Sequence, residues 1–339
     1  MRKINFITAI REAHMEEMSR DESVIILGED VAGTGGPFGC TKGILEKFGE
    51  NRAFDTPLSE CAIIGAAIGV AAFGFRPVAE IMFMDFVMAG GAMGLIVNQM
   101  AKLPFLGDFQ IKLPIVVRMP IGTRYPVISM GAHHAQSWET WFMHVPGLKV
   151  VAPSNPYEAK GLLKTAIRDD NPVMFLEPKV MYFSASKRLK EYQIDSEVPD
   201  DDYTIPFGEA NIVREGKDIT VVATMMMLQK VLRVLNDLDK EGISVELIDP
   251  RTLVPFDEQT IIKSVEKTRK LLVVSEDCIT AGVASDICAR IAEIDYGYPI
   301  KVSRLSGKDI PMLYSPAYEN YIIPNEDDIK SKIVGVLGN

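Results

Sequence analysis

Cysteine is scarce in this sequence of 339 residues, and the spacing of the four cysteines excludes the common cysteine-based sites. The sequence has no Cys-x-x-Cys pair and no spacing typical of zinc ligands. We therefore expect reduced, mostly buried thiols in a cytoplasmic protein. The four residues are Cys40, Cys61, Cys278 and Cys288.

The sequence also has no segment typical of export or of membrane insertion. Its first residues, MRKINFITAIREAH, lack the uninterrupted apolar core of a signal peptide. The longest apolar run, Ala62–Phe75, is too short and too rich in glycine and alanine to span a bilayer.

An excess of positive charge is absent as well. The net charge of −10 and the pI of about 5.1 argue against a surface for nucleic acid or anionic membranes.

Two common enzyme motifs are missing. No Gly-x-Ser-x-Gly nucleophile motif occurs, which argues against a serine hydrolase. The glycine-rich stretch Gly33–Gly39 follows an expected strand, but Phe38 stands where a dinucleotide motif starting at Gly33 needs glycine. Pro37 also interrupts the start of the helix on which a pyrophosphate would sit. A nicotinamide-binding protein is therefore an alternative that the sequence does not favour.

The length and the pattern of apolar residues predict an α/β protein with two domains. Hydrophobic residues make up 47% and charged residues 24%, as in globular proteins. Strands and helices are expected to alternate over residues 1–183, which predicts a mostly parallel sheet covered on both faces. The polar, acid-rich residues 184–206 are the expected linker. The alternation resumes over residues 207–339, where we expect a smaller α/β domain.

The stretch DTPLSECAIIGAAIGVAAFGFR, residues 55–76, places a lone acid at the start of an apolar helix. Thr56 and Pro57 break the preceding strand, and Ser59 is the expected N-cap. Glu60 follows in the first turn. It either complements the helix dipole or is partly desolvated, in which case its proton becomes useful for catalysis. A second mostly apolar helix is expected over residues 85–102.

Histidine occurs only four times, and two of the four lie in the long segment from Pro120 to Gln136. Long segments with few regular signals are usually functional in compact domains. His133 and His134 stand there close to Gln136. A metal site is an alternative, but adjacent histidines point in different directions and no third ligand is spaced nearby.

Eight segments occur in an order that is highly specific when they are taken together. They are LGEDV (27–31), TKGILEKFG (41–49), FDTPLSE (54–60), RPVAEIMFMDF (76–86), IVNQMAK (96–102), HHAQ (133–136), PGLKVVAPSNPYEAKGLLKTAIRDDNPVMFLEP (146–178) and IDPRTLVPFDEQTI (248–261). Nearly end to end, the chain closely resembles the beta subunit of the thiamine-diphosphate-dependent decarboxylating component of 2-oxoacid dehydrogenases. Pyruvate, branched-chain 2-oxoacid and acetoin dehydrogenases share this subunit. The resemblance implies a transketolase-like pyrimidine-binding domain followed by the transketolase C-terminal domain.

The resemblance also implies roles for four residues around the cofactor. Glu60, the glutamate of the TPxSE motif, would hydrogen-bond N1′ of the aminopyrimidine and favour the imino form that takes up the thiazolium proton. Glu29 matches an acid linked to the cofactor through water. Leu58 and Phe86 match positions that pack on the cofactor, and Phe86 would stack on the aminopyrimidine.

Two further expectations come from the same resemblance. The histidine of the family's HSQ motif falls on His134, with His133 at the preceding variable position. His134 would handle protons when the acyl unit moves to a lipoyl group. A potassium site built mainly from backbone carbonyls matches Ile115, Ala166, Ile167, Asp169 and Asn171.

The magnesium-binding motif of such enzymes begins with Gly-Asp-Gly, and the sequence contains none. The resemblance therefore implies that an alpha subunit holds Mg²⁺ and the diphosphate, in an α2β2 tetramer with active sites at α/β interfaces. The C-terminal domain of the beta subunit in this family also tends to dock the lipoyl acyltransferase core.

Two segments depart from the family pattern. AGGAMGL (89–95) is longer than its counterpart, rich in glycine and without the usual acid. The segment 120–133 also exceeds the usual length, and HAQ replaces HSQ. The acyl group is therefore left open among pyruvate, branched-chain 2-oxo acids and acetoin. A non-catalytic assembly subunit of the same fold is the alternative from a different functional class.

Overall fold

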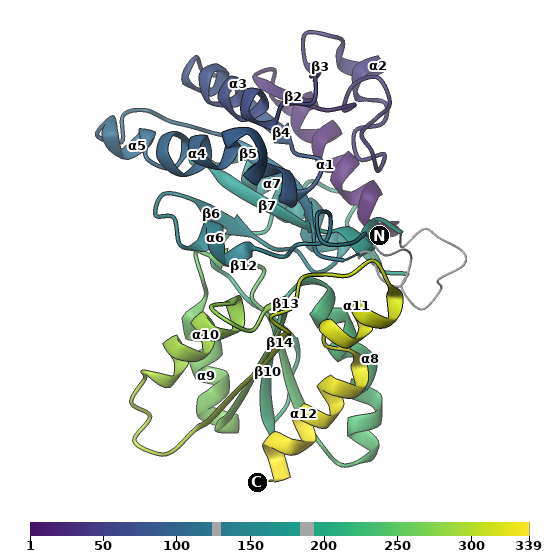
Figure 1. Ribbon diagram of the computed structural model, residues 1–339, viewed down its shortest axis with the longest axis vertical. Helices are drawn as coiled ribbons and strands as arrows, with labels where there is room; N and C mark the ends of the chain where they lie inside the picture. Colours follow the sequence, from purple (N-terminus) through teal and green to yellow (C-terminus); the bar gives the residue numbers. More distant parts are fainter. Residues whose placement is uncertain (124–129, 184–192, 339) are drawn as a thin grey trace. The chain divides into compact units, whose positions relative to one another are not determined.

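The computed structural model describes residues 1–123, 130–183 and 193–338 and divides the chain into two compact units (Figure 1). Unit 1 contains Met1–Ile121 and Trp141–Phe207, and unit 2 contains Gly122–Thr140 and Gly208–Asn339. Each unit has its own mostly parallel sheet, so the expected α/β fold with two domains of this kind is confirmed.

The sheet of unit 1 is parallel and buried. Six of its strands run in the order β6-β7-β5-β4-β2-β3. They are β2 (Val24–Gly28), β3 (Ala53–Asp55), β4 (Arg76–Glu80), β5 (Val116–Ile121), β6 (Lys149–Val151) and β7 (Val173–Pro178). Every residue of β2, β5 and β7 is buried, as expected for strands covered on both faces. The carboxyl ends of β2, β4, β5 and β7 therefore form one edge.

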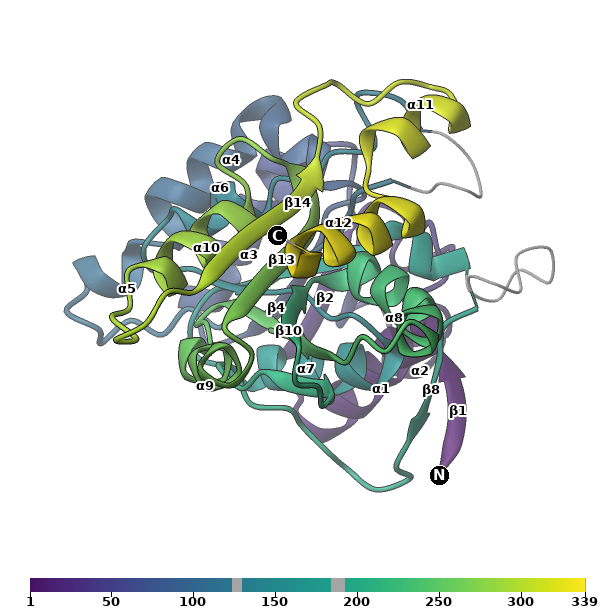
Figure 2. The ribbon, with the colours of Figure 1, turned by 90° about the horizontal axis from the view of Figure 1, so that it is seen from below.

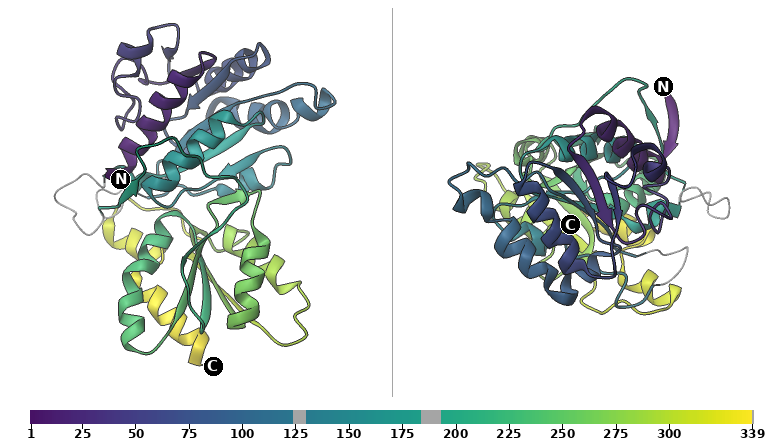
Figure 3. Two further views of the ribbon diagram at one scale, coloured as in Figure 1. Left: turned by 180° about the vertical axis from the view of Figure 1, so that it is seen from behind. Right: turned by 90° about the horizontal axis from the view of Figure 1, so that it is seen from above.

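Helices cover this sheet, and polar caps define where two of them begin. The helices are α1 (Phe6–Arg20), α2 (Ile44–Phe48), α3 (Glu60–Ala72) and α7 (Pro156–Arg168), with a short 3₁₀ segment η3 (Lys179–Phe183) after β7. Asn5 accepts a hydrogen bond from the Thr8 amide at 2.9 Å, and Asn155 accepts one from the Glu158 amide at 2.9 Å. Figure 3 shows α1 and α7 lying side by side.

The prediction of a single helix over residues 85–102 is wrong. The segment is divided into η1 (Met84–Gly91), α4 (Ala92–Leu95), the π-helical η2 (Ile96–Met100) and, after it, α5 (Leu103–Leu106). Gly91 has φ +87, a left-handed conformation that a regular helix cannot contain. Gly91, one of the glycines that make this segment unusual in sequence, thus interrupts the helix.

The expected linker contains one strand. Residues 195–198 form β8 (Asp195–Val198), which pairs antiparallel with β1 (Arg2–Asn5). Residues 184–192 of the expected linker lie outside the described residues. The division at residues 183 and 207 stays a prediction.

Unit 2 contains a second sheet with helices on both faces. Its strands follow the order β14-β13-β10-β11-β9, and only the β9–β11 pair is antiparallel. They are β9 (Asn211–Arg214), β10 (Ile219–Ala223), β11 (Val245–Asp249), β13 (Lys270–Cys278) and β14 (Lys301–Gly307); β12 (Thr252–Val254) follows β11. Helices α9 (Glu258–Thr268) and α10 (Val283–Ala292) cover one face, and α8 (Met225–Lys240) and α12 (Glu326–Gly338) cover the other (Figure 2). The short helix α11 (Pro316–Ile322) also belongs to unit 2, and α6 (Glu139–Met143) begins in unit 2 and ends in unit 1.

The cysteines are free, but the expectation that most of them are buried is wrong. Cys40 is buried, Cys61 and Cys288 are half-buried, and Cys278 is exposed. Within the described ranges, no helix is both long and apolar enough to cross a membrane.

Candidate functional site

Two acids meet at the carboxyl edge of the unit 1 sheet. Glu29 directly follows β2, and Glu60 begins α3. Glu29 is 5% exposed, and in the described part of the chain neither of its carboxylate oxygens has a fully formed hydrogen bond. Burial raises the pKa of Glu29, and the nearby charges of Glu60 and Asp30 raise it further. The Ser59 backbone amide lowers the pKa in turn, so Glu29 is a buried acid with incomplete hydrogen bonding, which makes it a candidate for ligand binding.

Glu60 is the only acid in the first turn of α3, and it is half-buried. Ser59 occupies the N-cap position, as expected, and its side chain makes no capping hydrogen bond. The amides at this helix start are therefore available to a ligand or to solvent. Leu58, just before the helix, is 83% exposed. An exposed leucine beside two acids suits a ligand with both an apolar face and polar atoms.

Phe86 lies in η1, just beyond β4, and is half-buried. Its ring packs edge-to-face against Phe83, with ring centroids 5.3 Å apart and an interplanar angle of 87°. The four residues expected around the cofactor thus all belong to unit 1, and each of them follows a strand at the carboxyl edge of its sheet. They are Glu29 after β2, Leu58 and Glu60 after β3, and Phe86 after β4. Open parallel sheets bind ligands at this edge.

Sequence reasoning missed the role of Asp55, the last residue of β3. Its carboxylate accepts hydrogen bonds from the amides of Ala32 at 2.6 Å and Gly33 at 2.9 Å. The Thr56 amide donates to the Gly28 carbonyl at 2.9 Å. Asp55 therefore ties the chain after Glu29 to the turn before Glu60. The only signal in the sequence is that Asp55 belongs to the FDTPLSE segment.

A buried ion cluster behind the two acids was also missed. Arg118 on β5 is 1% exposed and makes two hydrogen bonds to Glu177, at 2.6 and 2.8 Å, and one to Glu80 at 2.6 Å. The hydroxyl of Tyr182 donates to Glu177. The cluster links β4, β5 and β7 at their carboxyl ends. Charged residues at the ends of apolar strand sequences were the available signal, because such residues are buried only when they are paired.

The histidine pair belongs to unit 2. His133 is exposed, His134 is half-buried, and the His134 amide donates to the Gly131 carbonyl at 3.4 Å. The side chain of Gln136 donates to the Ala132 carbonyl. Residues 124–129 of the expected functional segment lie outside the described residues. No group of three potential metal ligands from histidine, cysteine or acids occurs in the ranges described, so the metal alternative gains no support.

Two buried carboxyls follow the histidines in unit 2. Glu139 is 1% exposed, and burial, together with the charge of Asp277, raises its pKa to about 8. Burial raises the pKa of Asp277 to about 6. Glu139 accepts from the Ser137 hydroxyl at 2.7 Å, and Asp277 accepts from the Val283 amide at 2.6 Å. Near neutral pH Glu139 therefore holds its proton, whereas Asp277, with the lower pKa, is the ionised member of the pair.

The expected potassium ligands belong to unit 1, and protein cations already contact two of them, Ile167 and Asp169. Arg76 donates to the carbonyls of Ile167 at 3.2 Å and Asp169 at 3.1 Å. Lys149 pairs with the Asp169 carboxylate, and Asn171 donates to the same carboxylate at 2.9 and 3.0 Å. A potassium ion would have to share these oxygens with two protein cations. Potassium binding stays a prediction that the geometry does not support.

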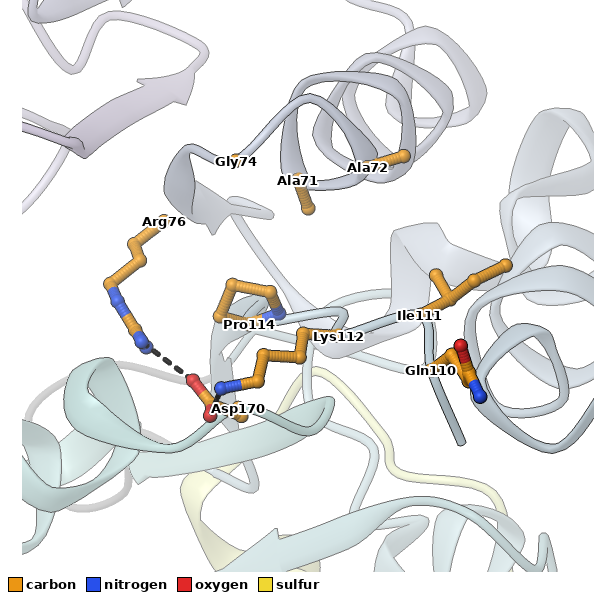
Figure 4. Close-up of a pocket in the computed structure, with 9 residues that line it drawn as sticks. All are labelled: Ala71, Ala72, Gly74, Arg76, Gln110, Ile111, Lys112, Pro114 and Asp170. Carbon is orange, nitrogen blue, oxygen red and sulfur yellow. Dashed lines mark hydrogen bonds and ion pairs between the residues drawn. The ribbon is translucent and has the colours of Figure 1, made fainter. Parts of the chain in front are cut away.

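A pocket of about 390 Å³ in unit 1 is separate from the two acids (Figure 4). Ala71 and Ala72, from the last turn of α3, line it, whereas Glu60 begins that helix. Asp170 on its floor pairs with Arg76 at 2.6 Å and Lys112 at 2.7 Å. Because a helix of 13 residues is about 20 Å long, this pocket cannot hold a ligand that touches Glu60.

Comparisons with known proteins match both parts of the chain. The family model described as "Transketolase, pyrimidine binding domain" matches residues 2–184. The model described as "Transketolase, C-terminal domain" matches residues 208–329. Glu29, Leu58, Glu60 and Phe86 all fall within the first match.

Curated relatives match over nearly the full length. The 2-oxoisovalerate dehydrogenase subunit beta of Bacillus subtilis is 44% identical, with 98% of each chain covered. The beta subunit of acetoin:2,6-dichlorophenolindophenol oxidoreductase of Cupriavidus necator is 42% identical, covering 97% of this chain and 96% of the relative. The pyruvate dehydrogenase E1 component subunit beta of Rickettsia conorii is 40% identical, covering 95% and 94%.

Among solved structures, a "Split gene transketolase, inactive beta4 tetramer" aligns with a TM-score of 0.77. The alignment covers 99% of this chain and 98% of that chain at 21% identity. This similarity concerns the fold alone.

Proposed function

The chain belongs to the family of beta subunits of 2-oxoacid and acetoin dehydrogenase E1 components, and on this premise we propose that it binds the aminopyrimidine end of thiamine diphosphate. The reaction we propose is the oxidative decarboxylation of a 2-oxo acid, with transfer of the acyl group to a lipoyl group. This activity requires an alpha subunit.

The observation that supports this proposal best is the pair formed by Glu29 and Glu60. Glu29 is buried with incomplete hydrogen bonding, and Glu60 starts a helix whose first amides are not capped by the Ser59 side chain. A heterocycle with ring nitrogens and an amino group supplies the donors and acceptors that these groups lack. The exposed Leu58 and the ring of Phe86 supply the apolar contacts such a heterocycle needs.

Each residue then has a defined task. Thiamine diphosphate supplies, when bound, the nucleophilic carbon and the electron sink of the decarboxylation. Glu60 holds a proton against the aminopyrimidine nitrogen N1′ and so favours the imino form. Glu29 orients water near the cofactor. Phe86 stacks on the aminopyrimidine, and His134 moves a proton during acyl transfer to the lipoyl group.

The partners follow from what the sequence lacks. Without a Gly-Asp-Gly motif, this chain has no counterpart of the family's ligands for Mg²⁺ and the diphosphate. We assign both to the alpha subunit of an α2β2 tetramer. The lipoyl acyltransferase core is the second proposed partner, and the cytoplasm is the proposed location.

The proposal is tested by reconstitution with an alpha subunit, thiamine diphosphate and Mg²⁺. We expect reduction of an artificial electron acceptor that depends on one substrate from a panel of pyruvate, branched-chain 2-oxo acids and acetoin. Glu60→Gln lowers kcat about 100-fold or more, because the proton at the ring nitrogen is lost. Glu46→Gln, an exposed acid on α2, is the control and leaves kcat unchanged.

The two alternatives give different outcomes in the same assay. Turnover of acetoin alone identifies an acetoin dehydrogenase beta subunit, an alternative supported by the 42% identity to such a protein. A stable complex of both subunits without turnover of any substrate identifies a non-catalytic assembly subunit. The interrupted helix at Gly91, in a segment that departs from the family pattern, is the observation that favours this second alternative.

A further inference from the structure

We propose that Phe38, in the glycine-rich loop Gly33–Gly39, is a positioning residue that fixes Phe86 through Phe83. The loop therefore has a role, although it does not bind a dinucleotide. The inference rests on the proposed function of Phe86 as the ring that stacks on the aminopyrimidine.

The glycine-rich loop forms a tight turn, and Phe38 in this loop is half-buried. The Gly36 amide donates to the Asp30 carbonyl at 2.8 Å, and the Thr41 amide donates to the Gly35 carbonyl at 3.0 Å. Gly35 has φ +85, and a Cβ there would lie 2.7 Å from Cα of Lys42. Only glycine fits at this position. The loop is thus a tight, specified turn.

Phe38 belongs to a column of aromatic rings. It stacks on Tyr182, with ring centroids 4.6 Å apart and an interplanar angle of 24°. It also packs edge-to-face against Phe83, at 6.0 Å and 80°. Phe83 in turn packs edge-to-face against Phe86 at 5.3 Å. These distances are those of favourable aromatic pairs.

Buried charges anchor the column. The Tyr182 hydroxyl donates to Glu177, which Arg118 holds with two hydrogen bonds. The ammonium group of Lys179, a fully buried residue, lies 4.5 Å from the ring centroid of Phe83. Tyr182 and Phe83 therefore have little freedom to move, and Phe38 fills the space between them.

Phe86 needs such support because its own backbone segment is weak. The Phe86 amide donates to the Phe83 carbonyl at 3.0 Å, a bond typical of the 3₁₀ helix η1. The segment then ends at Gly91 in a left-handed conformation. Hydrogen bonds in a 3₁₀ helix have poorer geometry than those in an α-helix, so we expect ring packing to help determine where Phe86 points.

A spectroscopic experiment tests this link without cofactor or turnover. 4-Fluorophenylalanine is placed at position 86 of the full chain, and its ¹⁹F resonance is recorded. We expect Phe38→Ala to shift and broaden the resonance, and Phe38→Leu, which keeps an apolar side chain for folding, to shift it as well. Phe38→Tyr keeps the ring and restores the original resonance. Phe48→Ala, a half-buried phenylalanine of α2, is the control and leaves the resonance in place.

The reconstituted enzyme gives a second measurement. Phe38→Ala raises the KM for thiamine diphosphate about 2- to 10-fold, the range of one aromatic pair, and changes kcat little at saturating cofactor. Phe38→Ala adds nothing further when Phe86 is already alanine, because it acts through Phe86.

Two results overturn the inference: an unchanged resonance in folded Phe38→Ala and Phe38→Leu, or the same shift in Phe48→Ala. Additive effects of Phe38→Ala and Phe86→Ala on the cofactor KM also contradict it. If the resonance shifts but the wild-type complex shows no cofactor-dependent turnover, the proposed function fails and the link between the two rings stands.

Discussion

Buried ionisable side chains determine how single residues contribute to stability at the carboxyl edge of unit 1. Arg118 is enclosed by Glu80 and Glu177, and these residues are almost fully buried. Burying charges is unfavourable, so the cluster is stable only as a complete set. Removing any one of these three side chains should therefore destabilise the other two.

Arg118→Met should destabilise the chain by about 3–5 kcal/mol, because it leaves two acids buried without a cation. Urea unfolding of the isolated chain measures this change. Lys112→Met is the control, since Lys112 is 72% exposed and should change the unfolding free energy by no more than about 0.5 kcal/mol. Equal effects of the two substitutions would show that the cluster does not stabilise unit 1.

The acid pair in unit 2 predicts a pH dependence. The pKa of Glu139 is raised to about 8 from an ordinary 4.5, so the folded state binds a proton that the unfolded state has lost. Stability should therefore decrease as the pH rises from about 4.5 through 8. Glu139→Gln should flatten the fall in melting temperature between about pH 5 and pH 8. An unchanged slope in this variant would mean that Glu139 is ionised in the folded protein.

Glycine has opposite effects in two elements of unit 1. In the loop Gly33–Gly39, Gly35→Ala should destabilise the chain by about 1–3 kcal/mol, because φ is positive and the Lys42 backbone is close. In α3, Gly69→Ala should stabilise it by about 0.5–1 kcal/mol, because the position is helical and no atom lies within 4 Å of the added Cβ. Thermal unfolding of both variants measures the difference, and a change of the same sign in both would contradict the loop geometry.

Elements with strong local signals could be predicted from the sequence. Helix α7 (Pro156–Arg168) carries such signals, because Asn155 caps it and Pro156 favours its first turn. The prediction of one helix over residues 85–102 was wrong, because apolar periodicity does not show where a glycine leaves the helical conformation. Sequence patterns thus predict elements better than their interruptions.

The candidate site was predictable only in part, and the reason lies in long-range packing. Glu60 stood out as a lone acid in an apolar helix, whereas Glu29, Leu58 and Phe86 came from the family resemblance. The aromatic column and the cluster around Arg118 were not foreseen. Both join segments far apart in the chain, and no local pattern in a single sequence indicates such contacts.

At the scale of the whole molecule, the proposed function makes this chain one part of an active site. Residues 2–184 and 208–329 match the pyrimidine-binding and C-terminal domains of transketolase, and its relatives are beta subunits. The acids of unit 1 are suited to the pyrimidine end of the cofactor, and the sequence has no motif for its diphosphate. The proposed activity is therefore a property of the complex with an alpha subunit.

The most direct test of this account is the distance between the Glu60 carboxyl and the pyrimidine ring nitrogen in a structure of the α/β complex with thiamine diphosphate. The account predicts a hydrogen bond of about 2.6–3.2 Å, with the diphosphate and Mg²⁺ held by the alpha subunit. A Glu60 side chain that points into solvent, or that lies away from the subunit boundary, would contradict it.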